Sequence, residues 1–307
     1  MEILLQQIIN GLVQGSVYAL VALGYTMVYG ILGLINFAHG EVVMMGAMVA
    51  LAAIKALLAT ALSPVLVLLF SLLAAVGVCM ALGYGIERIA YRPLRHAPRL
   101  APLITAIGVS IVLQTLAMIV WGREYHAFPQ LLPNASHSIG GAVINEVQIA
   151  IVLVAFLVML ALLLLVQRTR LGRAMRAVAE NPSAAALMGV NINGVISTTF
   201  MLGSALAALA GIMVSANYGI VHYYMGFMLG LKAFTAAVLG GIGNLRGAML
   251  GGVMLGLIES LGAGYSGALT GGVFGSNYQD VFAFFVLIAV LIFRPSGLLG
   301  ERVAERA

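Results

Sequence analysis

Charged side chains interrupt otherwise apolar stretches at Glu41, Lys232 and Glu259. A charge at the centre of a bilayer costs at least about 3 kcal/mol on insertion scales, so such a residue usually faces a protein interior or a water-filled path. Lys232 and Glu259 stand on neighbouring stretches and could pair with each other, or Lys232 could extend its ammonium group to the outer interface. We favour a structural or gating role for both residues over contact with a substrate.

His39 lies just before Glu41, and a histidine near a carboxylate could relay protons. We favour a plainer interpretation, in which Asn36 and Glu41 cap a break between two helices. The histidines lack the spacing of metal ligands, and the sequence has no Ser/His/Asp or paired-carboxylate arrangement, so neither a metal site nor an enzyme is predicted. Glu87, next to Arg88, is expected to be simply interfacial.

The polar segment 167–192 is the most informative part of the sequence. Asn181 is a good helix N-cap, Pro182 suits the first helical position and Gly189 is a helix terminator, so a short alanine-rich helix is expected to run as far as Met188. Such a helix, flanked by arginines, could dock in a groove of another protein. It could equally lie on the membrane surface with the arginines at anionic headgroups.

Glycines are dense between residues 240 and 256, and two pairs, Gly247/Gly251 and Gly252/Gly256, have the spacing of close helix contacts. A nucleotide-binding loop is the alternative interpretation. The sequence contains no Gly-x-x-x-x-Gly-Lys-Ser/Thr motif, and the glycines lie between apolar stretches, so helix packing is predicted.

The composition explains what must position these residues. The chain is 62% hydrophobic and only 8% charged, whereas soluble domains carry roughly 25% charged residues. A membrane-spanning helix needs about 20 apolar residues. We therefore predict an all-α membrane bundle, a single domain over residues 1–307, of about eight or nine spans. The expected spans are 8–31, 41–60, 64–87, 102–121, 147–166, 193–216, 227–241 (short for a full span), 247–264 and 279–294.

The basic residues set the expected orientation. They gather at Arg88–Arg99, at Arg168–Arg176 and toward the C-terminus, and only Lys55 and Arg123 lie between the other apolar stretches. This asymmetry is typical of cytoplasmic loops. It places the C-terminus inside, the N-terminus outside and the segment 122–146 as an outside loop. The same distribution argues against nucleic-acid binding, although the net charge is +5.

Several motifs follow one another along the chain. They are YTMVYGI at 25–31, INFAHGE at 35–41, IERIAYRP at 86–93, the stretch from GRA to AE at 172–180, and KAFTAAVLGGIG at 232–243. Together they resemble the LivH-type permease subunits of branched-chain amino acid ABC importers, over nearly the whole chain. The resemblance implies a multi-pass protein of the bacterial inner membrane that moves branched-chain amino acids into the cytoplasm.

The resemblance also implies partners. A second permease, two ATPase subunits that bind ATP and magnesium, and a periplasmic binding protein would complete the importer, and this chain would carry no cofactor itself. The short helix would be the ATPase-coupling helix, although Ser183 replaces the usual glutamate of this helix and Glu180 would have to substitute for it. The residues then assigned to coupling are Glu180, Asn181, Pro182, Ser183, Ala184, Ala185 and Gly189.

A zwitterionic cargo would need a wet or polar path. The candidates for lining or gating it are Asn36, His39, Glu41, Asn217, Tyr218, Lys232 and Glu259. Two rival functions remain open. A urea or short-amide permease would share this scaffold, and a self-contained secondary transporter would need ion-coupling carboxylates in the middle of the membrane.

Overall fold

The computed structural model describes residues 2–95, 97–98, 100–269, 271 and 278–300. Arg99, Arg302 and Arg306 of the basic clusters lie outside the described residues. The helices are α1 (Glu2–Leu32), α2 (His39–Leu57), α3 (Pro64–Ile86), a π-helical turn η1 (Glu87–Tyr91), a 3-10 turn η2 (Arg92–Leu94), α4 (Leu100–Trp121), α5 (Glu146–Arg168), α6 (Arg170–Glu180), α7 (Pro182–Leu187), α8 (Ile192–Tyr218), α9 (Met225–Gly240), α10 (Leu245–Leu269) and α11 (Gln279–Phe293).

The predicted helical membrane bundle is confirmed. Within the described residues, seven helices are long and apolar enough to cross a bilayer, and α9 and α11 are shorter apolar helices. Each of the expected apolar stretches is helical. The shortness predicted for 227–241 is confirmed, because α9 ends at Gly240 and begins only at Met225. The exact number of spans stays a prediction.

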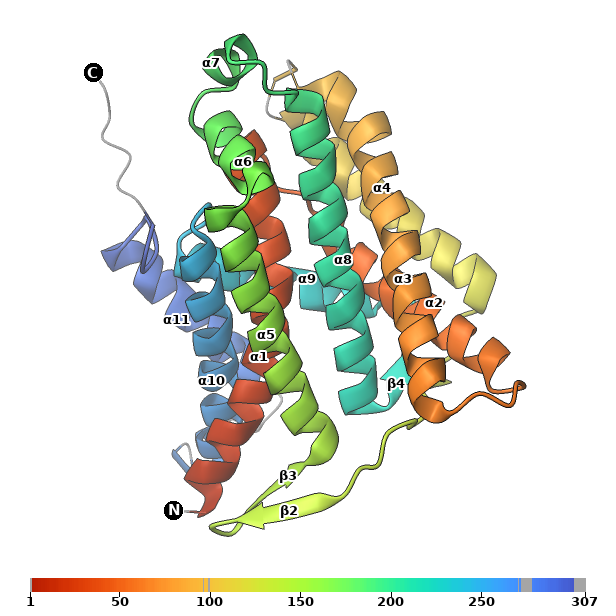
Figure 1. Cartoon of the computed structure of the whole chain (residues 1–307). Coiled ribbons are helices and arrows are strands. Elements are labelled where there is room, and N and C mark those ends of the chain that lie inside the picture. The colour runs from red at the N-terminus through yellow and green to blue at the C-terminus, as the bar shows by residue number, and fades with distance from the viewer. Residues whose placement is uncertain (1, 96, 99, 270, 272–277, 301–307) are drawn as a thin grey trace.

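The two ends of the bundle differ in character. Figure 1 shows α7 at one end, and the N-terminus with a small hairpin at the other. In this hairpin β2 (Ser136–Ile139) pairs with β3 (Ala142–Asn145), and Gly140 and Gly141 make the turn with φ of 58° and 87°, as a type I′ turn requires.

The expected loop 122–146 is thus partly strand, since its backbone groups need partners outside a helix. A second short pair joins β1 (His126–Ala127) to β4 (Ile220–Val221). This pair fixes the loop to the end of α8. The loop therefore lies over the same end of the bundle as the N-terminus.

Among the described residues, the most extensive helix contact is between α1 and α10, and small residues form it. A Cβ on Gly11 would lie 2.8 Å from the backbone of Leu257, and one on Gly15 equally close to Val253. Gly256 in turn abuts the backbone at Gly15. The predicted packing role of the glycines is confirmed at these contacts, because only residues without a Cβ allow two helix backbones to approach so closely.

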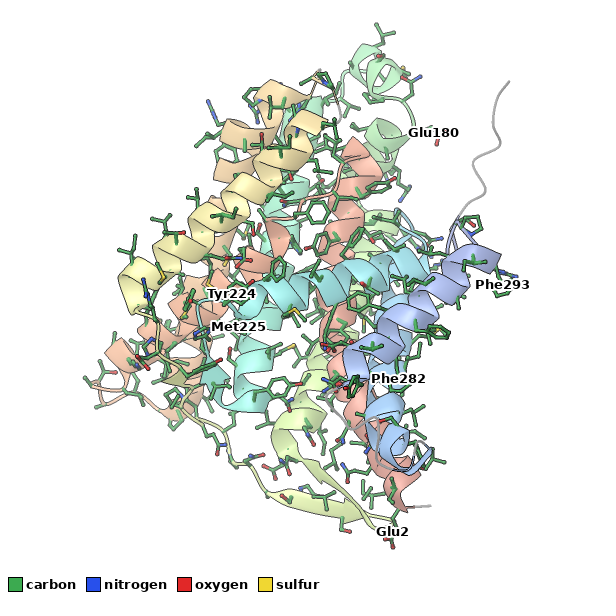
Figure 2. All side chains as sticks on the ribbon, turned by 180° about the vertical axis from the view of Figure 1, so that it is seen from behind. Glu2, Glu180, Tyr224, Met225, Phe282 and Phe293 are labelled. Atoms are coloured by element: carbon green, nitrogen blue, oxygen red, sulfur yellow. The ribbon has the colours of Figure 1, made fainter. Side chains whose placement is uncertain are left out.

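Helix α9 crosses the bundle instead of running along it. Figure 2 shows Met225, where α9 begins, at mid-height between Glu2 and Glu180, which mark opposite ends. The start of α2 meets it there, since a Cβ on Gly40 would lie 2.8 Å from the Cα of Gly230. Two helices thus begin inside the bundle.

Burial is uneven around the bundle. Most of α1 and α8 is buried, whereas α3, α4 and α5 turn most of their apolar surface outward. Hydrocarbon tails are as apolar as leucine, so such outward surfaces are stable in lipid or against another membrane subunit. The core therefore holds the two helix starts, with the outward-facing helices around them.

Candidate functional site

The segment 167–192, for which a coupling role is predicted, is built by three consecutive side-chain caps. Thr169 accepts a hydrogen bond from the Gly172 amide at the start of α6. Asn181 accepts one from Ala184 at the start of α7, at 3.0 Å, and Asn191 caps α8 in the same way. Each cap satisfies an N–H group that a helix start leaves free. The predicted short helix is confirmed, and it begins at Pro182.

The surface of α7 is mostly open. Leu187 is 89% and Met188 84% exposed, and Glu180 and Ser183 are exposed too. Ala185 is the exception, because it is 4% exposed and packs inward. Of the residues assigned to coupling, Ala185 therefore holds the helix in place instead of offering a contact. The exposed apolar pair Leu187 and Met188 was not predicted from the sequence. Two large apolar residues beyond the end of a membrane span were the signal that could have identified it.

The predicted pairing of Lys232 with Glu259 is confirmed, with 3.2 Å between Nζ and Oε2. Lys232 also pairs with Asp280 on α11, at 2.7 Å. The hydroxyl of Tyr18 donates to Glu259 Oε2 at 2.8 Å. The Lys232 side chain is 12% exposed, so its ammonium group does not reach out to an interface. The cluster ties α1, α9, α10 and α11 together inside the bundle.

A polar cavity of about 350 Å³ lies at the end of the bundle opposite α7. Its size falls within the range of small-molecule pockets. The Nε2 of Gln14 donates to the hydroxyl of Tyr218 at 3.0 Å, and Ser260 donates to Gln7 at 2.7 Å. The polar lining residues are uncharged, and they are Gln7, Asn10, Gln14, Gln148, Asn217, Tyr218, Ser260 and Gln279. The structure thus brings Asn217 and Tyr218 together in one hollow.

Glu41 lies deep in the bundle, 1% exposed, where α2 and α9 begin. Its Oε1 accepts hydrogen bonds from Gln114 at 2.6 Å and from Ser110 at 3.3 Å, both on α4. Its Oε2 has no hydrogen-bond partner among the described residues and lies 2.7 Å from where a Cβ on Gly226 would be. A buried oxygen without a partner calls for an explanation. A buried carboxylate oxygen without a partner can accept a hydrogen bond from a cationic group such as an ammonium.

The expectation that Asn36 and Glu41 cap the helix is wrong. α2 begins at His39 with Ala38 as its N-cap and no side-chain cap. The Oδ1 of Asn36 instead accepts a hydrogen bond from the Tyr91 hydroxyl at 3.1 Å. The ring of His39 packs edge-on against Tyr25, with 4.8 Å between centroids. Tertiary contacts, and not local capping, therefore fix this turn.

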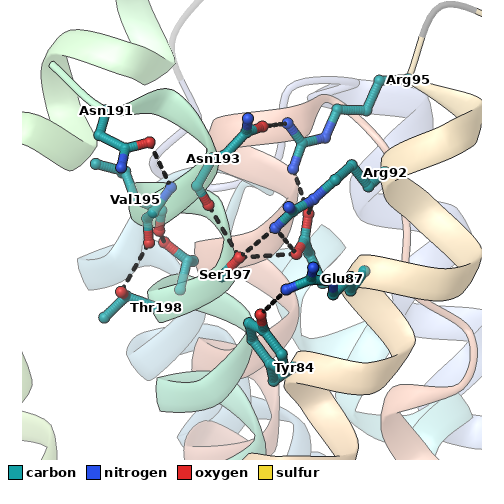
Figure 3. Close-up of polar contacts among 12 residues, drawn as sticks. Tyr84, Glu87, Arg92, Arg95, Asn191, Asn193, Val195, Ser197 and Thr198 are labelled. Carbon is teal, nitrogen blue, oxygen red and sulfur yellow. Dashed lines mark hydrogen bonds and ion pairs between the residues drawn. The ribbon is translucent and has the colours of Figure 1, made fainter.

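Glu87 was expected to be an ordinary interfacial residue, yet its side chain is fully buried. It forms ion pairs with Arg92, at 2.7 Å, and with Arg95. Ser197 on α8 donates a third hydrogen bond at 2.8 Å. Figure 3 shows this cluster between the end of α3 and the start of α8. A carboxylate flanked by several arginines was a signal in the sequence for such a cluster.

The chain is similar to known transport permeases over nearly its whole length. Residues 7–291 match the family described as "Branched-chain amino acid transport system / permease component". The chain belongs to the branched-chain amino acid transport permease family. It is 50% identical to the high-affinity branched-chain amino acid transport system permease protein BraD of Pseudomonas aeruginosa, over 98% of this chain and 97% of that protein. It is 45% identical to the permease protein LivH of Escherichia coli K12, with the same coverage.

In this branched-chain amino acid permease, the predicted site residues fall into separate groups. Asn217 and Tyr218 line the end cavity, and the Lys232 cluster lies next to it, because Ser260 and Gln279 of the cavity adjoin Glu259 and Asp280 in sequence. His39 and Glu41 lie at the helix starts. Asp280 and Gln114 were missed, although Asp280 carries the same signal as Glu259, a charge in an apolar stretch. No comparison tests any of these roles, which stay predictions.

Proposed function

We propose that this chain is a transmembrane permease subunit of an ATP-binding cassette importer that moves leucine, isoleucine and valine from the periplasm to the cytoplasm. The observation that carries the proposal is α7, a capped and exposed helix at one end of a membrane bundle. The sequence has no phosphate-binding loop of its own. Any energy from ATP must then come from a partner, and α7 offers that partner a place to bind.

The partners follow from the same proposal. Two ATPase subunits, which bind ATP and magnesium, would contact the α7 end, and the arginines around α6 support a cytoplasmic side there. A periplasmic binding protein would deliver the amino acid at the opposite end, where the polar cavity lies. A second permease, a paralogue or another copy, would complete the membrane path. The outward apolar faces of α3, α4 and α5 leave room for it.

The path would be polar but weakly charged. The end cavity offers amide and hydroxyl groups to a zwitterionic amino acid. Uncharged groups bind such a substrate weakly enough for it to leave the cavity again. Glu41, at the meeting of the α2 and α9 starts, is our candidate for a gate that the ammonium group of the amino acid contacts in passing. Helices that begin inside the membrane often surround transported solutes, since their free N–H groups point into the path. Lys232 and Glu259 would hold the helices around it.

Purification of the complex from its own host, followed by reconstitution into liposomes, tests this function. We expect two ATPase subunits to copurify, and import of leucine to require ATP, magnesium and the binding protein. Import driven by a proton gradient without ATP would instead establish a secondary transporter. Binding of urea and not leucine by the cognate binding protein would establish the short-amide permease.

The coupling role of α7 has its own test in Gly189→Pro. Gly189 has φ of 82°, which proline cannot adopt, and its amide donates to Ala186 at 2.9 Å. The change distorts the connection from α7 to α8 while leaving the membrane helices intact. We expect the subunits still to assemble and leucine import to stop. Normal import into vesicles would show that the coupling assignment is wrong.

A further inference from the structure

The π-helical turn η1 makes polar contacts both with the start of α8 and with the turn between α1 and α2. Its first residue, Glu87, bonds to the start of α8. Its last residue, Tyr91, bonds to the turn between α1 and α2. Turns of this type interrupt regular helix geometry and are frequent at functional sites. The two ends of η1 therefore need a joint explanation.

We propose that η1 carries movement of the docking helix α7 to the turn between α1 and α2, with Glu87 and Tyr91 as positioning residues for transport. This inference rests on the proposed importer function. It adds a route by which events at the ATPase side reach the buried helix starts.

The first link joins α7 to Glu87 through the start of α8. Few residues separate the end of α7 at Leu187 from the start of α8 at Ile192, and capped geometry fixes both helix starts. Asn193 and Ser197, in the first turns of α8, both contact the Glu87 cluster. Arg95 donates to the Oδ1 of Asn193 at 2.6 Å, and Arg92 donates to Ser197 at 2.8 Å.

This first link is stiff because charges and hydrogen bonds converge on one carboxylate. Glu87 is fully buried, and Figure 3 shows Arg92, Arg95 and Ser197 arranged around it. Charge-assisted hydrogen bonds of this kind are short and directional. Moving the start of α8 must therefore move η1, or break several bonds together.

The second link runs from Tyr91 to the turn. Tyr91 is 1% exposed, and its ring packs on Phe200 of α8 with 5.2 Å between centroids. Its hydroxyl can donate to either of two acceptors, Asn36 Oδ1 at 3.1 Å and the carbonyl oxygen of Ile35 at 3.3 Å. This hydroxyl is a polar contact between η1 and the backbone of the turn. It would pull the turn along when η1 moves.

The third link joins the turn to the helix starts. Phe37, just after Asn36, packs against Phe234 of α9 with 5.7 Å between ring centroids. The turn then enters α2 at His39, two residues before Glu41. A displacement at Asn36 therefore reaches both α2 and α9, at the place where the two helices touch. A chain of packed contacts alone does not demonstrate coupling, so the test must separate coupling from stability.

Tyr91→Phe is the sharpest variant, because it removes only the hydroxyl and keeps the ring on Phe200. Tyr84→Phe is the matched control. Tyr84 lies one turn before η1, and within the described part of the chain its hydroxyl bonds only to Arg88. Both changes are made in the full complex in liposomes, with leucine, the binding protein and ATP. We measure ATP hydrolysis and leucine import, and take their ratio.

We expect Tyr91→Phe to assemble normally and to hydrolyse ATP within about twofold of the unchanged complex, while import falls about tenfold, so that fewer leucines move per ATP. Tyr84→Phe should change neither quantity. An unchanged ratio in Tyr91→Phe, whether import stays normal or falls together with hydrolysis, would overturn the proposal. Failure of the unchanged complex to import leucine with ATP would instead refute the proposed function.

A distance measurement gives an independent readout. Spin labels at the exposed Ala186 on α7 and at Leu34 in the turn report whether the two segments move together when ATP binds. The reference label stands at Ile139 in the β2–β3 hairpin, which lies off the proposed route. We expect an ATP-dependent change of distance distribution between Leu34 and Ile139 that disappears in Tyr91→Phe, while the change between Ala186 and Ile139 persists. Equal changes at Leu34 with and without the hydroxyl would rule out η1 as the route.

Discussion

The backbones of Gly40 and Gly226 touch where α2 and α9 begin, since a Cβ on Gly40 would lie 2.5 Å from the carbonyl oxygen of Gly226. A Cβ on Gly226 would meet the carbonyl oxygen of Gly40 equally closely. The contact is mutual, so neither helix start can accept a side chain without moving the other. The pair therefore sets how the two helix starts are placed in the bundle.

Gly226→Ala should force these starts apart. Overpacking of a buried contact costs about 1–3 kcal/mol, so we expect a lower thermal unfolding temperature and reduced leucine import. Gly85→Ala is the control, because a Cβ there meets nothing within 4 Å. Unfolding in detergent and uptake in liposomes measure the two effects. An alanine at Gly226 that behaves like the control would show that the contact is looser than this structure indicates.

Glu41→Gln tests charge without changing shape. A glutamine carbonyl can still accept the hydrogen bond from Gln114, so we expect assembly and stability to change by less than about 1 kcal/mol. If the negative charge of Glu41 contacts the ammonium group of the amino acid during transport, leucine import should fall about tenfold while ATP binding stays unchanged. Glu124→Gln, in the exposed segment after α4, supplies the control. Full import by Glu41→Gln would assign Glu41 to packing alone.

Lys232→Met should be strongly destabilising. It leaves Glu259 and Asp280 facing each other without their shared cation, and loss of one partner of a buried ion pair costs about 3–5 kcal/mol. Adding Glu259→Gln and Asp280→Asn to the same chain should restore much of the loss, because no unpaired charge then remains. The thermal unfolding temperatures of the triple variant, of Lys232→Met and of the exposed control Lys55→Met test this prediction. A single variant as stable as Lys55→Met would refute the structural role.

Leu187→Ser combined with Met188→Ser should leave the permease folded, since both side chains are largely exposed. If α7 docks on the ATPases through this apolar pair, we expect the ATPase subunits to dissociate during purification. Ile139→Ser is the matched change at the opposite end, where Ile139 is 56% exposed. Pull-down with quantification of the ATPase subunits measures the effect. Equal recovery in both variants would place the docking contact elsewhere.

Features that repeat or leave a local signature were predictable from the sequence. The apolar stretches predicted the helices, and Asn181 with Pro182 predicted α7. The spacing of Gly252 and Gly256 predicted a close helix contact, although the partner, α1, became known only from the structure. Lys232 and Glu259 could be paired because each stands alone in an apolar stretch. In these cases the physical cause lies within a few residues of the chain.

Features that depend on distant partners were not predictable in this way. Asn36 has the residue type and sequence position of a helix cap. Its side-chain oxygen instead accepts a hydrogen bond from Tyr91, which lies on another helical segment. Glu87 looks interfacial because Arg88 follows it, whereas Ser197 and two other arginines enclose it. The orientation of α9 across the bundle could not be predicted either, because a short apolar stretch indicates the length of a helix but not the direction of its axis. Tertiary contacts decide all three.

The pairing of α1 with α10 has a consequence for how the protein is made. α1 is synthesised well before α10, whose residues Leu257 and Val253 cover the small-residue stripe at Gly11 and Gly15. During most of synthesis this stripe must stay uncovered or be shielded by lipid or another membrane protein. A chain that stops before α10 should therefore leave α1 loosely held and open to membrane proteases. Completion of the bundle is in this sense a late event, which depends on the last third of the sequence.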